Sequence, residues 1–383
     1  MSNALDTEHA VRERYSAAAE QREPQLCCPV DYDTQYLKII PQEVIDRDYG
    51  CGDPSKYVQA GETVLDLGSG GGKICFIAAQ VVGSTGKVIG VDMNDTMLDL
   101  ARRSQVKVSE HLGYDNVTFH KGKIQDMAID RDRLDGYLSK HPVQDESSLR
   151  NLESEVSRMR REAPMIPDNS VDVVVSNCVL NLVDSSEKEQ LFQEIFRVLR
   201  PGGRAVISDI VSDEVVPERM QNDSELWSGC ISGAFQEVDF LRAFERAGFY
   251  GIEMPILQKE PWQTVEGIEF RSATVIAYKG KQGPCDDYNE AVIYRGPFSV
   301  VLDDDGHEFR RGERTAVCRK TFGIMTRAPY TEHFAPVPPH QAVADEDAQP
   351  MSCLGELRSP RTTKGEDYNV TSSDDCCGSE ACC

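Results

Sequence analysis

The residues best suited to chemistry lie in a glycine-rich turn, VLDLGSGGGKICFIAAQVVG, where an apolar strand leads into a helix. Gly68, Gly70 and Gly72 let the main chain approach a ligand where any Cβ would collide, and the helix that follows presents unpaired N–H groups. Asp92 ends the next apolar strand, 24 residues after Gly68, with Met93 beside it. A carboxylate at that place accepts hydrogen bonds from two ribose hydroxyls. The pattern therefore predicts a cofactor that contains a nucleoside.

The glycine spacing excludes the two commonest nucleotide motifs. A dinucleotide fingerprint would place its third glycine at Lys73 or Cys75, and a P-loop needs Ser or Thr where Ile74 stands. What remains resembles the D-x-G-x-G-x-G motif of class I S-adenosylmethionine (SAM) methyltransferases. The resemblance implies that SAM is the cofactor, and its expected contacts are Asp66, Gly68, Gly70, Gly72, Asp92, Met93 and Asn177.

Cysteines are the candidates for the methyl acceptor side of the site. Cys178 follows directly after a buried strand, Cys230 lies in the glycine-flanked loop LWSGCISGAF, and Cys51 lies in DYGCG. Three converging thiols form a soft, trigonal ligand set. A tetrahedral structural zinc would need a fourth ligand and usually shows C-x-x-C pairs, which this chain lacks. Trivalent arsenic fits better, because its lone pair stays available as a nucleophile when three thiolates hold it.

The cysteine contexts YGCG, VSNCVLNLV and LWSGCISGA, together with the glycine motif, resemble arsenite SAM methyltransferases over about residues 10–280. The resemblance implies that the thiols of Cys51, Cys178 and Cys230 hold arsenite or methylarsenite. It further implies in-line methyl transfer from the SAM sulfonium to arsenic. Reduction by enzyme thiols and an external system, thioredoxin or glutathione, would follow.

The same resemblance implies a further redox cysteine near the N-terminus. That position falls on Cys27 or Cys28, and the sequence does not decide between the two. Among the other cysteines, we expect Cys75 to pack in the core, and Cys285 and Cys318 to have structural roles.

The elements that must position these residues alternate between strand and helix. This alternation predicts an α/β fold with a doubly wound, mostly parallel sheet, whose ligand lies at the carboxyl ends of the strands. The expected organisation is an N-terminal cap at 1–60, a methyltransferase domain at 61–280 with a helical insert at about 130–165, a small β-rich appendage at 281–325, and a disordered tail at 326–383.

Composition and charge limit the classes of partner that we expect this chain to bind. The formal net charge is 41 − 64 = −23, and such a field repels nucleic acid and anionic lipid. No apolar run approaches the ~20 residues of a membrane span, and the N-terminus shows no secretory signal, so we expect a cytoplasmic protein. Thirteen cysteines in a reducing compartment favour metalloid or redox chemistry over a disulfide framework.

Three functions remain open on the sequence alone. They are methylation of trivalent arsenic, methylation of an organic small molecule by a protein whose cysteines only pack, and binding of metalloid without methyl transfer. The tail pairs Cys376–Cys377 and Cys382–Cys383 either capture arsenic for the site or are incidental thiols.

Overall fold

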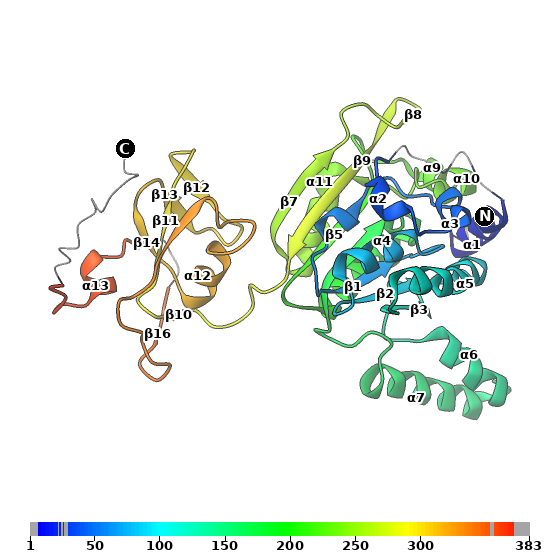
Figure 1. Cartoon of the computed structure of the whole chain (residues 1–383), viewed down its shortest axis with the longest axis horizontal. Coiled ribbons are helices and arrows are strands. Elements are labelled where there is room, and N and C mark those ends of the chain that lie inside the picture. Colours follow the sequence, from blue (N-terminus) through cyan, green and yellow to red (C-terminus); the bar gives the residue numbers. More distant parts are fainter. Residues whose placement is uncertain (1–6, 22, 24–25, 27–29, 353–355, 371–383) are drawn as a thin grey trace. The chain divides into compact units, whose positions relative to one another are not determined.

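A computed structural model describes residues 7–21, 23, 26, 30–352 and 356–370 of the chain. Its internal contacts divide the chain into two compact units, Met1–Gly280 and Lys281–Cys383 (Figure 1). Among the described residues, no helix is long and apolar enough to cross a membrane.

The first unit is built on one sheet with the strand order β3-β2-β1-β4-β5-β9-β7. The strands from β3 to β5 run parallel, whereas β9 is antiparallel to both β5 and β7. Two short strands extend it, β6 beside β5 and β8 beside β9. The bounds are β1 Thr63–Leu67, β2 Lys87–Asp92, β3 Val117–Lys121, β4 Val171–Asn177, β5 Leu199–Ser212, β6 Phe235–Gln236, β7 Tyr250–Leu257, β8 Gln263–Val265 and β9 Ile268–Tyr278. The mostly parallel α/β fold predicted from the sequence is confirmed.

Helices cover both faces of this sheet, and central strands such as β1 and β4 are buried on both sides. Val64 of β1 packs into a core with α4 and α5, whereas its neighbour Leu65 packs into a second core with α8 and α11. These helices are α4 Lys73–Val82, α5 Asp95–Leu112, α8 Lys188–Val198 and α11 Glu237–Ala247. The chain leaves β1 toward β2 and β3 and returns on the other side at β4, so a crevice opens at the carboxyl ends of β1 and β4.

Short helices flank this crevice. The N-terminal segment contributes α1 Thr7–Glu20, α2 Thr34–Leu37, α3 Gln42–Asp46 and the 3-10 helix η2 Pro54–Tyr57. Between β4 and β6 lie η3 Leu180–Leu182, η4 Ser185–Glu187, α9 Glu218–Gln221 and α10 Ser224–Ser228. The segment from which an insert was expected holds two helices, α6 Arg131–Lys140 and α7 Glu146–Glu162.

In its described residues, the second unit is a set of short strands with two helices. Its elements are β10 Asp286–Asp287, β11 Ala291–Tyr294, β12 Val300–Leu302, β13 Glu308–Arg310, β14 Arg314–Ala316, α12 Arg319–Met325, β15 Phe334–Val337, β16 Gln349–Pro350 and α13 Pro360–Lys364. β11 pairs with β14 on one side and with β15 on the other.

The expected disorder from residue 326 onward is wrong for the described part of that segment. β15 completes the sheet around β11, and Phe334 is buried with its ring against Phe309 and Tyr294. The proline-rich, acidic composition concealed this strand, because its partner lies some forty residues earlier and a single buried aromatic anchors it. Residues 353–355 and 371–383 lie outside the described part.

Candidate functional site

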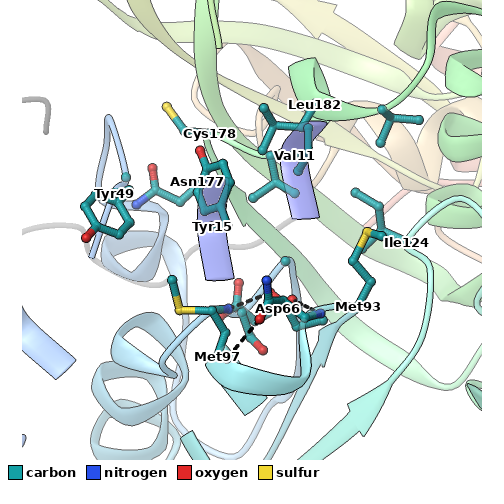
Figure 2. A pocket seen from close by; sticks show the side chains of 18 of the residues that line it. Val11, Tyr15, Tyr49, Asp66, Met93, Met97, Ile124, Asn177, Cys178 and Leu182 are labelled. Atoms are coloured by element: carbon teal, nitrogen blue, oxygen red, sulfur yellow. Dashed lines mark hydrogen bonds between the residues drawn. The ribbon is translucent and has the colours of Figure 1, made fainter. Parts of the chain in front are cut away.

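A pocket opens at the carboxyl ends of β1, β2 and β4 (Figure 2). Its walls come from the glycine turn after β1, the start of α5, helix α1 and the segment that follows β4. Figure 2 shows Asp66 and Met97 on one side of this pocket, with Asn177 and Cys178 across from them. The pocket thus has a glycine side and a sulfur side.

The glycine side has the backbone shape expected of a cofactor cradle. Gly68 has a φ of +66°, and a Cβ there would lie 2.4 Å from the Val179 side chain. Gly70 has a φ of +51°, yet a Cβ there would meet no protein atom within 4 Å. Its backbone therefore faces open space, as the approach of a ligand requires.

Asp92 holds this cradle together. One carboxylate oxygen accepts a hydrogen bond from the Gly70 N–H at 2.8 Å, and the other accepts from the Asn94 N–H at 2.8 Å. Burial raises the pKa of Asp92, and these backbone donors oppose the shift because they favour the charged form. Met93 and Asp92 both line the pocket.

Asp66 lies deeper, beneath the glycine turn. It is 2 % exposed, and burial raises its pKa to about 7. The Cys75 thiol donates to its Oδ2 at 3.2 Å. Cys75 lies on α4 and is fully buried in the core, as expected from its apolar neighbours.

On the sulfur side, the structure brings together the three cysteines singled out in the sequence. Cys51, Cys178 and Cys230 share one apolar cluster, and each is about 5 % exposed or less. Cys51 and Cys178 are joined in a disulfide with a Cα–Cα distance of 5.8 Å. The Cys230 thiol donates to the Cys178 carbonyl at 3.4 Å. Three segments remote in sequence therefore place their sulfurs in one cluster, and Cys178 of this cluster lines the pocket.

Tyr15 of α1 is a site residue that the sequence reasoning missed. Its hydroxyl lies 3.8 Å from the Cys230 sulfur, and its ring lines the pocket. Burial, with a contribution from Cys230, raises the pKa of Tyr15 well above its ordinary value, so the hydroxyl stays protonated and can donate to a thiolate. No signal in the sequence identifies it, because the contact joins residues 215 positions apart.

The Cys51 loop is held by side chains from two strands. Asn177 Oδ1 accepts from the N–H groups of Cys51 and Gly52, at 2.8 and 3.0 Å, and its Nδ2 donates to the Gly52 carbonyl at 2.8 Å. Ser272 of β9 donates to the Cys51 carbonyl at 2.7 Å. A Cβ at Gly50 would lie 2.0 Å from Asn177 Nδ2, so the loop can approach only as glycine. Asn177 lines the pocket, but its amide is engaged by the Cys51 loop.

A second unpredicted contact ties the Cys51 segment to the glycine turn. Lys73 Nζ lies 2.8 Å from Asp48 Oδ2 and 3.5 Å from the centroid of the Tyr32 ring. The Tyr32 hydroxyl in turn donates to the Gly52 carbonyl at 3.1 Å. The place of Lys73 at the first position of α4, directly after the glycine turn, is the sequence signal that points to this contact.

As arranged, the cysteines are not a preformed metal centre. Across the described residues, no three His, Cys, Asp or Glu side chains are grouped to hold a metal ion. Two of the three sulfurs are bonded to each other, so they can act as ligands only after reduction.

The remaining cysteines lie elsewhere. Cys318 is buried beside the Thr321 hydroxyl and Cys285 is partly buried beside Lys320, both in the second unit. Cys27 and Cys28, the candidates for the redox role, lie outside the described residues, as do the tail pairs.

Comparison with known proteins gives a consistent picture. Residues 58–159 and 143–248 match the model of a methyltransferase domain, and residues 281–368 match a domain of unknown function. An arsenite methyltransferase of Aquipseudomonas alcaligenes is 32 % identical over 80 % of this chain and 83 % of its own length. The human arsenite methyltransferase is 29 % identical over 78 % of this chain and 73 % of its own length.

A solved structure extends the similarity to three dimensions. An arsenic (III) S-adenosylmethionine methyltransferase of Chlamydomonas reinhardtii matches 83 % of this chain and 99 % of its own, with 27 % identity and a TM-score of 0.55.

Proposed function

The chain belongs to the family of arsenite methyltransferases and is a SAM-dependent enzyme, and on this premise we propose that it methylates trivalent arsenic held by the thiols of Cys51, Cys178 and Cys230. The observation that carries the proposal is the convergence of these cysteines, from three remote segments, in one cluster whose member Cys178 lines the pocket across from the glycine cradle.

The cradle fits SAM by its shape. Gly70 turns its backbone to open space, and Asp92 and Met93 line the same wall, where a ribose can be bound. SAM supplies a methyl group on a sulfonium sulfur, which is electrophilic without assistance. The residues of the chain then need only bind and orient the two reactants.

The sulfur side supplies the nucleophile. Arsenite exchanges its three hydroxyl groups for three thiols, and each exchange forms one As–S bond and releases one water molecule. The arsenic keeps its lone pair, which attacks the methyl carbon while the carbon–sulfonium bond breaks. Because no proton is removed in this step, a general base is unnecessary, in agreement with the apolar surroundings of the three sulfurs.

Methylation oxidises arsenic from the trivalent to the pentavalent state, and the enzyme can reverse this step with its own thiols. Two arsenic-bound thiolates leave as a disulfide and return two electrons to the cationic arsenic, and a water molecule that releases a proton takes one vacated position, which leaves the methylated arsenic neutral and trivalent. The Cys51–Cys178 disulfide supports this proposal, because it joins two of the three proposed ligands. An external dithiol then reduces the disulfide, with Cys27 or Cys28 as the relay.

The partners follow from this chemistry. A thioredoxin or glutathione system is the proposed reductant, and the need for reduced thiols favours the cytoplasm. The net charge of −23 disfavours nucleic acid as a partner.

The direct test is incubation of the purified protein with SAM, arsenite and a thiol, followed by speciation of the arsenic products. We expect methylated arsenic and S-adenosylhomocysteine in matched amounts. Arsenite binding without S-adenosylhomocysteine would indicate a metalloid-binding protein instead. Tight SAM binding with no effect of arsenite would indicate an organic acceptor.

A further inference from the structure

The turns that carry Cys178 and Cys230 share an unusual backbone. Their φ angles are +58° and +62°, in the left-handed region that favours glycine. A residue with a side chain rarely adopts this conformation, and keeps it only where its surroundings hold it. The two turns must therefore be fixed by something outside the cysteines themselves.

Asp209 of β5 fixes the Cys178 turn. Its Oδ2 accepts from the backbone N–H groups of Leu180 and Asn181, at 2.9 and 3.4 Å, and its Oδ1 accepts from the Ile210 N–H at 2.8 Å. Asp209 is fully buried. A carboxylate inside the sheet thus supplies the hydrogen bonds that the residues after Cys178 would otherwise lack.

Lys188 of α8 fixes the Cys230 turn, and its charge is positive whereas that of Asp209 is negative. Its Nζ donates to the Gly233 carbonyl, three residues after Cys230, and lies 4.2 Å from the Phe235 ring centroid and 5.9 Å from the Trp227 ring centroid. Lys188 is 9 % exposed. A buried ammonium thus holds the far side of the loop that begins at Trp227.

The Cys178 turn and the Cys230 turn pack closely against each other. A Cβ at Gly233 would lie 2.0 Å from the Asn181 carbonyl oxygen. Trp227 Nε1 donates to the Leu182 carbonyl at 3.2 Å. A shift of either turn would therefore displace the other.

The two buried charges also stabilise each other. Burial lowers the pKa of Lys188 to about 8, and Asp209 opposes this shift. Burial raises the pKa of Asp209 to about 6, and Lys188 opposes that shift. Near pH 7 both groups are mainly charged, so loss of either leaves the other as a buried charge with less compensation.

We propose that Asp209 and Lys188 are positioning residues that set the spacing of the Cys178 and Cys230 thiols for two-point binding of arsenic. The inference rests on the proposed function, because it concerns the same thiols. Neither residue contacts the reacting atoms. Each fixes one cysteine turn, and together they preorganise the pair before arsenic arrives.

The test needs an arsenical that must bridge this one pair of thiols. Phenylarsine oxide offers two exchangeable positions. In a background of Cys27→Ser, Cys28→Ser and Cys51→Ser, the proposed ligands that remain are Cys178 and Cys230. The only two tryptophans of the chain, Trp227 and Trp262, pack in the same cluster as these cysteines, so intrinsic fluorescence reports on this site and not on the tail.

In this background, Asp209→Asn and Lys188→Met should each weaken phenylarsine oxide binding by about 10-fold or more, as expected for loss of a charge-assisted hydrogen bond. SAM affinity by calorimetry should change little. The rate of alkylation by iodoacetamide should also change little, because that reagent needs only one thiol at a time. This combination distinguishes positioning from general destabilisation.

The opposite end of the sheet offers matched controls. Lys279 is 8 % exposed, donates to the Phe196 carbonyl at 2.7 Å and lies 4.7 Å from the Phe196 ring centroid. Asp172 is 7 % exposed and accepts from the Thr63 N–H at 2.7 Å. Lys279→Met and Asp172→Asn should leave phenylarsine oxide affinity unchanged.

The outcomes separate the two proposals. Equal phenylarsine oxide affinity in the background protein and in Asp209→Asn would overturn the positioning role. If Lys188→Met no longer bound SAM, its fold would be lost and Asp209→Asn alone would decide. No fluorescence response in the background protein itself would contradict the proposed function instead.

Discussion

On the glycine side of the pocket, the groups that form the cradle lie within one short stretch, with Asp92 only 24 residues after Gly68. On the sulfur side, Cys51, Cys178 and Cys230 come from segments separated by up to 179 positions, since 230 − 51 = 179. The glycine side is held by backbone hydrogen bonds to a single carboxylate. The sulfur side is held by side chains reaching across from other strands.

This difference teaches that the two sides can be altered separately. A local motif keeps its shape when a remote residue changes, whereas an assembled site depends on each of the contacts that hold its loops. Substitution of Asp92, which has no contact with the cysteine loops, should affect SAM alone. Substitutions on the sulfur side should affect arsenic alone, and they should act at a distance from the sulfurs.

The largest effect should come from removing a sulfur. Cys178→Ser and Cys230→Ser should each abolish methylation of both arsenite and methylarsenite, because a hydroxyl does not replace a thiolate as an arsenic ligand. SAM affinity should persist in both variants. Product speciation and calorimetry check the two statements, and methylated arsenic from either variant would show that the sulfur is not required.

The next largest effect should come from the glycine side. Asp92→Ala should weaken SAM binding by roughly 10- to 150-fold, corresponding to loss of a charge-assisted hydrogen bond of about 1.5–3 kcal/mol. Calorimetric titration with SAM measures this loss. Arsenical affinity should stay as in the wild type, and a parallel loss there would mean that the two sides are not separable.

A smaller effect should follow from loosening a loop without touching a sulfur. Asn177→Ala removes the acceptor for the Cys51 and Gly52 N–H groups, and should lower the rate of arsenite methylation by about 10-fold. Methylarsenite, which has only two exchangeable positions, should be less affected. Kinetics with both substrates and SAM titration measure the effect.

Asn116→Ala is the matched control for that substitution. Asn116 also donates to backbone carbonyls, those of Ala79 and Gly83, but away from the site. It should leave both rates unchanged. If Asn177→Ala instead impaired SAM binding and not the rate at saturating SAM, the predicted cofactor contact would be its main role.

The smallest effect should come from the C-terminal residues. Deleting 371–383 should preserve the maximal rate and raise the arsenite concentration needed to reach it, on the hypothesis that the cysteine pairs capture arsenic for the site at a local concentration of the order of millimolar. The deletion begins after residue 370 because an earlier cut would remove β15 or α13. Steady-state kinetics at limiting arsenite provide the measurement, and superimposable curves would exclude capture.

Features formed by neighbouring residues could be predicted from the sequence, whereas contacts between remote segments could not. The glycine cradle was predictable, because one strand, one turn and one helix contain it. The cysteines were predictable as candidates, because strand ends of a parallel sheet meet at one edge. The contacts of Asn177, Tyr15, Ser272 and Lys188 were not predictable, because each joins residues at least 45 positions apart.

Some of the missed residues left a partial signal. Asp209 interrupts the apolar strand sequence RAVISDIV, where a buried carboxylate needs a reason to be present. The disorder predicted after residue 325 was wrong because it rested on composition alone. A single buried aromatic residue, Phe334, anchors the strand β15 in that segment.

The central claim is that three protein thiols hold the arsenic. X-ray absorption at the arsenic edge measures the ligands directly, in the reduced full-length protein loaded with less than one equivalent of arsenite. The account predicts three sulfur neighbours and no oxygen in the wild type, and two sulfurs with one oxygen in Cys51→Ser. Three sulfur neighbours in both proteins, or oxygen neighbours in the wild type, would contradict it.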